Sequence, residues 1–149
     1  MKKILFVLLL TNLAFNASAQ TAEDSVKAVI NNLFTAMKTS NANLLKSLFA
    51  DSVILQTIET RTGKVVVKTD AVADFVTSIS KLPAGAADEQ ISFGSVKIDA
   101  DLASVWTPYK FYFNGKFSHC GANSFQLVRI NGEWKIQYLI DTRHRANCD

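Results

Sequence analysis

The chain contains 149 residues, carries a formal net charge of +3 at pH 7 and has two cysteines. Its length suits one domain with a core of its own and is too short for two. It has no basic stripe and no ladder of aromatic and arginine residues, which excludes nucleic acid as a predicted partner.

The first residues have the features of a secretory signal peptide. Lys2 and Lys3 form a positive start, residues 4–10 form a short apolar run, and Ala17-Ser18-Ala19 is an A-x-A cleavage site. The run is too short for a good transmembrane helix, and no cysteine stands near the cleavage site to carry a lipid. We therefore predict a signal peptide over 1–19, one mature domain over 20–149, and a periplasmic or secreted protein with no stable membrane anchor after cleavage. Loss of the two lysines lowers the net charge to +1.

Two helices are predicted at the start of the mature chain. The first covers Ala22–Lys38, with Thr21 or Asp24 as its N-terminal cap. Its apolar residues recur at helical spacing: Val26, Val29, Ile30, Leu33, Phe34 and Met37. A second, shorter helix carries four apolar residues: Leu44, Leu45, Leu48 and Phe49.

A hairpin and a third helix are predicted next. The β-rich runs Val53–Thr60 and Val65–Lys68 flank a turn at Arg61-Thr62-Gly63-Lys64. Thr69 or Asp70 then caps a helix with four inward apolar residues: Val72, Phe75, Val76 and Ile79.

Four strands are predicted in the C-terminal half: Ile91–Ile98, Leu102–Phe113, Lys116–Ile130 and Glu133–Thr142. Asn114-Gly115 and Asn131-Gly132 separate the last three. Asn-Gly between alternating apolar residues is the strongest short-range hairpin signal, because a type I′ turn needs positive φ at both central residues.

This order of elements predicts an α+β fold, a roll in which three helices pack on a strongly curved antiparallel sheet and leave a cone-shaped cavity. The order resembles the NTF2-like superfamily, also called the SnoaL-like or cystatin-like roll. Four segments carry the resemblance: Leu48-Phe49-Ala50-Asp51-Ser52-Val53, Trp106-Thr107-Pro108-Tyr109, Ser118-His119-Cys120-Gly121 and Trp134-Lys135-Ile136. The last three look like its secreted bacterial branch, described as lumazine-binding or SnoaL-like. The resemblance implies either a small-molecule ligand or an isomerase, dehydratase or cyclase type of activity.

The two Asn-Gly turns also assign side chains to faces, because they fix the register of the strands. With ideal two-residue turns, the predicted ligand-binding lining of the cone is Trp106, Tyr112, His119, Asn123, Phe125, Tyr138 and Ile140. A bulge near Pro108 would reverse the alternation and bring Tyr109 inward in place of Tyr112. An apolar pocket with a few polar groups predicts a small, mostly apolar or aromatic ligand.

The same register leaves a row of apolar residues on the outer face of the sheet: Val105, Tyr109, Phe111 and Phe113. This is a large apolar area to leave in water. It predicts a homodimer through the outer sheet face.

His119 is the best candidate for a catalytic residue, because imidazole titrates near neutral pH and can exchange protons or donate to a carbonyl. The alternative is a histidine hydrogen-bonded at the rim. The register places Asp141 and Arg143 outward, which disfavours a His119–Asp141 dyad. Of the carboxylates, only Glu59 is retained as a candidate. His119 and His144 lack a third ligand, so we predict no metal site and no cofactor.

Cys120 and Cys148 form an even pair, which predicts a disulfide in an oxidising compartment. In the chain-entropy model this bond stabilises the fold by roughly 3–4 kcal/mol. A reactive thiol and a pair of metal ligands are the alternatives.

Three functions follow from these residues. The first is an exported binder of a small apolar or aromatic molecule. The second is a SnoaL-like enzyme that moves protons with His119 and a tyrosine. The third is a dimerising interaction module without catalysis, whose cavity is filled by its own side chains.

Overall fold

The computed structural model describes residues 21–61 and 63–148. The predicted signal peptide, residues 1–19, lies outside these ranges. No helix among the described residues is long and apolar enough to cross a membrane.

The three helices lie where the sequence predicts them, with two differences. α1 covers Ala22–Lys38 and begins with a capping box between Thr21 and Asp24, as expected. α2 covers Ala42–Ser47 and ends before Phe49, which starts a strand instead. α3 covers Val72–Ser80, and its N-cap residue, Ala71, makes no side-chain cap. The predicted caps Thr69 and Asp70 are wrong because both residues belong to the preceding strand.

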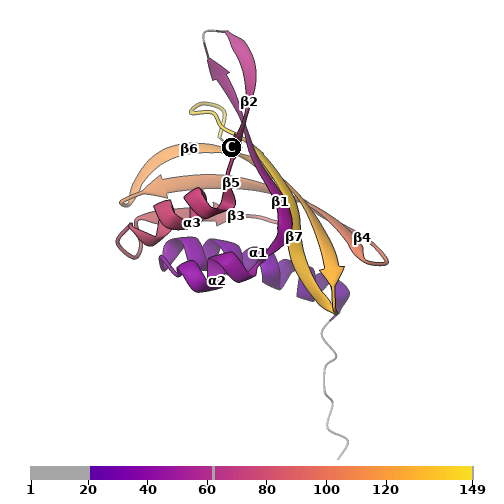
Figure 1. Ribbon diagram of the computed structural model, residues 1–149. Coiled ribbons are helices and arrows are strands. Elements are labelled where there is room, and N and C mark those ends of the chain that lie inside the picture. The colour runs from indigo at the N-terminus through magenta and orange to yellow at the C-terminus, as the bar shows by residue number, and fades with distance from the viewer. Residues whose placement is uncertain (1–20, 62, 149) are drawn as a thin grey trace, which may run out of the picture.

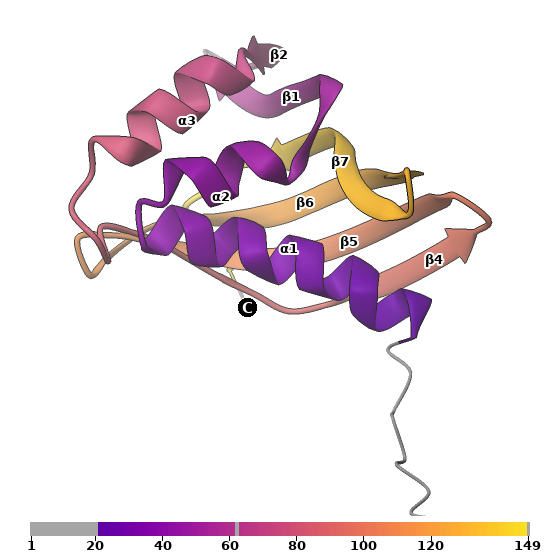
Figure 2. The same cartoon turned by 60° about the horizontal axis from the view of Figure 1, so that its bottom comes forward.

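Seven strands form one curved sheet, and the helices cover one of its faces (Figures 1 and 2). The strands are β1 (Phe49–Arg61), β2 (Lys64–Asp70), β3 (Ala87–Ile91), β4 (Ser95–Asp99), β5 (Leu102–Phe113), β6 (Lys116–Ile130) and β7 (Glu133–Thr142). Their order is β2-β1-β7-β6-β5-β3, and β4 pairs with the other end of β5. All pairings are antiparallel except that of β1 with β7.

The strand predicted over Ile91–Ile98 is two strands, β3 and β4. Both pair with β5, and the break between them lies beside Pro108. Ser92 N–H still donates to the Pro108 carbonyl, but proline has no N–H to return a bond. The proline therefore interrupts the ladder on this side of β5. On the other side it pairs in register with Ala122, so the predicted bulge is not there.

The register does shift near both Asn-Gly turns. Phe111 pairs with His119, but Tyr112 pairs with Phe117, so Ser118 is an extra residue in β6. Such a bulge reverses the side-chain alternation of one strand relative to the other. With His119 inward, Phe111 and the alternate residues before it on β5 also face inward. Tyr112 still pairs with Phe117 as predicted, but it alternates with Phe111 and therefore faces outward. Tyr109 faces inward as the bulge alternative foresaw, although the bulge lies elsewhere.

A second bulge lies in β7. Leu127 pairs with Ile136, whereas Gln126 pairs with Tyr138, so Gln137 is the extra residue. Beyond it, Leu139 and Asp141 face the helices, and the alternate side chains face away.

These two bulges overturn part of the predicted inner face. Val105 and Phe111, predicted outward, pack with the core under the helices, and Tyr109 is buried. The homodimer through the outer face stays a prediction, but three of the four residues that suggested it are on the inner face. Phe125 is inward as predicted and is fully buried, with its ring edge-on to Phe34 at 6.3 Å.

The disulfide prediction is confirmed, since Cys120 and Cys148 are bonded. The segment after β7 also pairs with β6 at one position, where the backbones of Cys120 and His144 exchange two hydrogen bonds of 2.9 Å. The C-terminal segment is therefore held on the sheet by a covalent bond and by backbone pairing.

Gly121 is required where β7 crosses close to β6. A Cβ at this position would overlap the Thr142 carbonyl oxygen and would come within 3.0 Å of the Tyr109 ring. The first of these is a backbone atom, which cannot move without displacing the strand.

We predict that Gly121→Ala lowers the free energy of unfolding by about 3 kcal/mol, measured by urea denaturation, because β7 must shift. Gly94→Ala is the matched control. Its Cβ would approach the Trp106 ring at 3.0 Å and the Trp106 carbonyl oxygen at 3.3 Å, and both contacts are milder than the overlap at Gly121. A cost for Gly121→Ala no larger than that of the control would show that the close approach is not a constraint.

Candidate functional site

A pocket of about 350 Å³ lies between the curved sheet and the helices, where the sequence predicts a cone. Six of the lining residues are apolar: Met37, Leu55, Phe75, Ile79, Phe111 and Leu139. The rest of the lining, called the polar wall below, is polar and includes Thr57, Glu89, His119, Asp141 and Arg143. The cavity is therefore not filled by side chains, which removes the premise of the interaction module with a filled cone.

Asp141 is the centre of a buried polar network. Its Oδ1 accepts a hydrogen bond of 2.6 Å from Thr57, and its Oδ2 accepts one of 2.8 Å from Arg143 Nε. The Tyr109 hydroxyl lies 3.1 Å from Oδ2 and 2.9 Å from the Thr142 carbonyl oxygen, so one proton serves two acceptors. Burial and then the negative charge of Asp141 raise the pKa of Tyr109, which keeps the phenol protonated.

Arg143 holds this network together from the rim. Besides its ion pair with Asp141, its Nη2 donates to the Thr57 hydroxyl at 3.1 Å. The guanidinium is half exposed, whereas the Asp141 side chain is only 9% exposed. The buried carboxylate is thus neutralised by a cation that keeps contact with water.

Glu89 is a second carboxylate on the same wall. It projects from β3, and its Oε1 accepts a hydrogen bond of 2.8 Å from Asn123 Nδ2. Asn123 also donates to Thr107 at 3.3 Å, which fixes the orientation of its amide. Burial, together with the nearby charge of Asp141, outweighs this hydrogen bond and raises the pKa of Glu89 to about 7. Glu89 therefore exchanges its proton near neutral pH.

His119 lies beside these groups on β6. Its ring is 5.7 Å from the Tyr109 ring and 5.0 Å from the Phe111 ring, and its Nδ1 is 3.1 Å from the Ser118 hydroxyl. Burial and then the positive charge of Arg143 lower the pKa of His119, so its ring is neutral at pH 7.

The structure brings only part of the predicted lining to the cone. His119 and the amide of Asn123 are at the polar wall, and Phe125 lies in the core behind it. The inward orientation predicted for four residues is wrong, because the bulges turn them to the other face: Trp106, Tyr112, Tyr138 and Ile140. Tyr138, for example, donates to Gln56 at 2.7 Å instead of pointing under the helices.

Sequence reasoning retained none of the four carboxylates that line the pocket: Asp70, Asp74, Glu89 and Asp141. It placed Asp141 outward, and the second bulge brings it inward. It did not retain Glu89, which lies just before the strand predicted over Ile91–Ile98. Glu59, the carboxylate that was retained, pairs with Val66 far out on the β1–β2 hairpin. An alternating pattern across Ala87, Glu89 and Ile91 was the available signal for Glu89.

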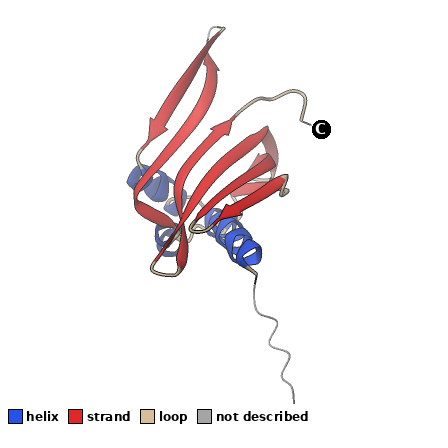
Figure 3. Ribbon diagram, turned by 90° about the vertical axis from the view of Figure 1, so that its right-hand side faces the viewer, coloured by secondary structure: helices blue, strands red, loops and turns tan. Residues whose placement is uncertain are grey.

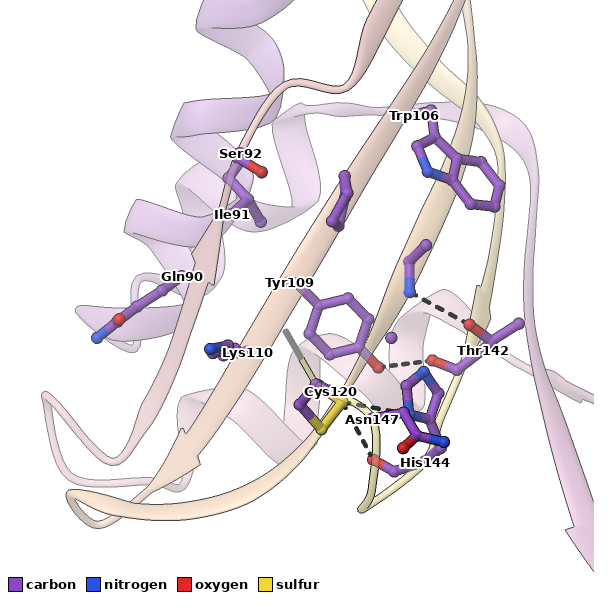
Figure 4. A pocket seen from close by; sticks show the side chains of 14 residues that line it. Gln90, Ile91, Ser92, Trp106, Tyr109, Lys110, Cys120, Thr142, His144 and Asn147 are labelled. Carbon is purple, nitrogen blue, oxygen red and sulfur yellow. Dashed lines mark hydrogen bonds between the residues drawn. A yellow bond between two sulfur atoms is a disulfide. The ribbon is translucent and has the colours of Figure 1, made fainter.

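A second, wider hollow of about 540 Å³ lies on the outer face of the sheet (Figure 4). Trp106, Pro108 and Lys110 line it from β5, and the C-terminal segment closes one side with His144 and the disulfide. The acidic groups Glu89, Asp141 and Asp70 line the cone and not this hollow. The cone is therefore the better candidate for chemistry.

One cluster has the residue types of a metal site. Ligand atoms of Cys120, His144 and Cys148 lie within 4.8 Å of one another. Both sulfurs are bonded in the disulfide, so neither is a thiolate that can bind a metal ion.

We predict that ionisation of Glu89 makes the fold less stable as the pH rises. Below about pH 4.5 the residue is neutral in both folded and unfolded chains. Between this value and about pH 7 the unfolded chain loses the proton while the folded chain retains it, so the free energy of unfolding falls. The expected loss is on the order of 3 kcal/mol between about pH 4.5 and pH 8.

Glu89→Gln isolates this effect, because glutamine keeps an oxygen for Asn123 and does not titrate. Urea denaturation of both proteins at the two pH values is the measurement. All other groups titrate in both proteins, so the wild type should lose about 3 kcal/mol more than the variant. The same pH dependence in both would contradict the raised pKa.

No protein-family model and no curated protein matches the chain. Its structure is similar to several solved structures of low sequence identity. An NTF2-like protein of unknown function from Shewanella baltica superposes with a TM-score of 0.65 at 11% identity, over 83% of this chain and 94% of that one. An NTF2-like protein of unknown function from Methylobacillus flagellatus superposes with a TM-score of 0.62 at 16% identity, over 82% of this chain and 91% of that one.

A protein with a cystatin-like fold from Nostoc punctiforme gives a TM-score of 0.64 at 12% identity, over 85% of this chain and 95% of the other. At such identities the likeness concerns the fold. The coverage of nearly the whole of each chain and the match of three helices on a curved, open sheet confirm the fold class expected from the sequence. The protein has the NTF2-like, or cystatin-like, fold.

Proposed function

We propose that the cone binds a small organic molecule with an apolar body and one neutral polar group, such as a hydroxyl or a carbonyl. The lining of the cavity, which combines six apolar side chains with a group of polar ones, carries this proposal. Pockets of this size with a few convergent polar groups are typical of small-ligand sites.

The hydrogen bonds already present on the polar wall indicate which groups meet the ligand. Asp141 is occupied by donors on both oxygens, whereas Asn123 binds Glu89 through Oε1. Among Glu89, His119 and Asp141, this leaves Oε2 of Glu89 and Nε2 of His119 without a hydrogen bond in the described part of the chain and able to contact a ligand. Four carboxylates line the pocket and disfavour an anionic ligand, and Lys68 and Arg143 balance part of their charge, which is why we propose a neutral one.

We also propose that the protein is exported. The Cys120–Cys148 disulfide is compatible with an oxidising compartment outside the cytoplasm. A periplasmic or secreted protein would meet its ligand there.

A second candidate function is acid–base catalysis in the same pocket. The observation that favours it is Glu89, which exchanges its proton near pH 7 in a pocket that is also lined by apolar side chains. General acid–base catalysis is most effective when the pKa lies near the working pH. The Glu89 carboxylate would take a proton from a carbon next to a carbonyl group and return it at another position. This assigns proton transfer to Glu89, with His119 as a neutral hydrogen-bond donor, in place of the predicted His119 and a tyrosine.

We predict that blocking the mouth of the cone abolishes ligand binding. Ser78 lines the pocket from an exposed position on α3, so Ser78→Trp places a large ring at the opening without disturbing the core. Ser80→Trp is the matched control, because Ser80 is exposed on the same helix and does not line the pocket.

Native mass spectrometry of the protein purified from its own host is the measurement, followed by thermal unfolding with a panel of small aromatic and aliphatic alcohols and ketones. We expect a bound molecule, or a rise in Tm of several degrees, in the wild type and in Ser80→Trp but not in Ser78→Trp. Equal binding by both variants would place the site elsewhere, and no binding by any of the proteins would overturn the proposal.

For the catalytic candidate, we predict that the protein exchanges deuterium from D₂O into the carbon next to the carbonyl of ketones that bind the cone. The rate should rise with pH through about 7, as Glu89 becomes a carboxylate, and Glu89→Gln should lower it at least 100-fold. Ketones that bind without exchange would support binding alone and exclude proton abstraction.

A further inference from the structure

The β1–β2 hairpin projects from the body of the molecule and leaves one edge of the sheet open (Figures 1 and 3). β2 is the last strand on this side among the described residues. Three successive valines are exposed along it: Val65 by 71%, Val66 by 43% and Val67 by 51%. An exposed apolar edge strand with unpaired backbone groups is a template for another strand.

The geometry of such an edge permits few pairings of β2 with a second copy of itself. Alternate residues of an edge strand direct their N–H and C=O groups outward. In an antiparallel pair of identical strands, an even-numbered residue must therefore face an even-numbered one, and an odd-numbered residue an odd-numbered one. The pairings centred on Val66, Val67 or Lys68 are the ones that overlap most of the strand.

The charges on β2 select one of these pairings. Centring on Val66 places Lys64 opposite Lys68 twice, and centring on Lys68 places the two copies of that lysine face to face. Centring on Val67 overlaps the whole strand and places Lys64 opposite Asp70 twice. Opposite charges across a strand pair stabilise it and like charges destabilise it. Asp70, the acidic residue in this register, also forms an ion pair of 2.7 Å with Lys68 of its own chain, so Lys64 of the second copy would be its second basic neighbour.

We infer that β2 pairs with β2 of a second copy of this chain, antiparallel and centred on Val67, so that two sheets become continuous. The pairing is isologous: the same edge is used by both copies, and each contributes one Lys64 and one Asp70. It satisfies the unpaired backbone groups and places the two copies of Val67 against each other. Lys68 and Asp70 also line the cone, so Lys64 of the second copy lies beside the rim of that pocket. This interface is separate from the outer sheet face.

A cysteine at the symmetry centre tests the register. In Val67→Cys the two new thiols face each other, with Cα atoms roughly 4.5–5.5 Å apart, which suits a disulfide. Val65→Cys is the control on the same face, since its two copies are about 13 Å apart in this register. The full chain, expressed with its own N-terminal segment and mildly oxidised, should give a covalent dimer on a non-reducing gel only for Val67→Cys. Equal crosslinking of both variants, or none by Val67→Cys, would overturn the inference.

Exchange of the two charges provides an independent test. We expect sedimentation equilibrium to show a dimer whose Kd rises at least tenfold in Lys64→Glu and in Asp70→Lys, and recovers in the double variant that carries both. Lys97→Glu, a charge reversal on exposed β4, should leave the Kd unchanged. A monomer at all concentrations, or a dimer insensitive to these changes, would refute the edge pairing. Circular dichroism is the control that each variant is folded. A dimer whose Kd is unchanged by these charge substitutions would point to the outer sheet face as the interface.

Discussion

The contents of the cone depend on two single extra residues in the sheet. Side chains alternate between the faces of a strand, so one inserted residue exchanges the two faces along the rest of the strand. Ser118 does this between β5 and β6, and Gln137 does it between β6 and β7. Without these bulges, Tyr109 and Asp141 would point into water, and Trp106 and Tyr138 would occupy the cavity. The bulges therefore place a polar network where a regular sheet would have placed aromatic rings.

This network also connects strands that are distant in the sequence. Thr57 lies on β1, Tyr109 on β5 and Asp141 on β7, and their hydrogen bonds meet at one carboxylate. Burial of a carboxylate costs several kcal/mol unless donors and a cation surround it. Here two hydroxyls and the guanidinium of Arg143 supply them. Loss of Arg143 would leave the charge uncompensated, and loss of either hydroxyl would remove a hydrogen bond from it. The network therefore ties the three strands together around the pocket.

The sequence predicted the elements better than their faces. Asn114-Gly115 and Asn131-Gly132 have positive φ at all four residues, as a type I′ turn requires, and the strands that they join have the predicted ends. A turn fixes the register only as far as the next irregularity. Neither Ser118 nor Gln137 has a residue type that marks a bulge, because either fits a regular strand. His119 and Asn123 lie on β6, the strand between the two turns, and the sequence assigned them to the correct face. Asp141 lies on β7 beyond the bulge at Gln137, and its face was predicted wrongly.

Glu89 was missed for a different reason. Its pKa and its position depend on Asn123 and Asp141, which come from β6 and β7 and are more than thirty residues away. Sequence spacing within β3 contains no information about them. Only the pairing of β3 with β5, and of β5 with β6, brings these groups to one wall.

The polar wall is difficult to explain as a structural feature alone. Apolar residues of similar size in place of a buried ion pair often leave a protein equally stable or more stable. The cone also keeps a cavity of about 350 Å³, and unfilled space in a core lowers stability further. In this pocket Glu89 costs stability at neutral pH, and Asp141 requires three partners. Natural proteins retain such unfavourable arrangements mainly at functional sites. The energetic cost of this wall is therefore itself an argument that the cone binds or transforms a ligand.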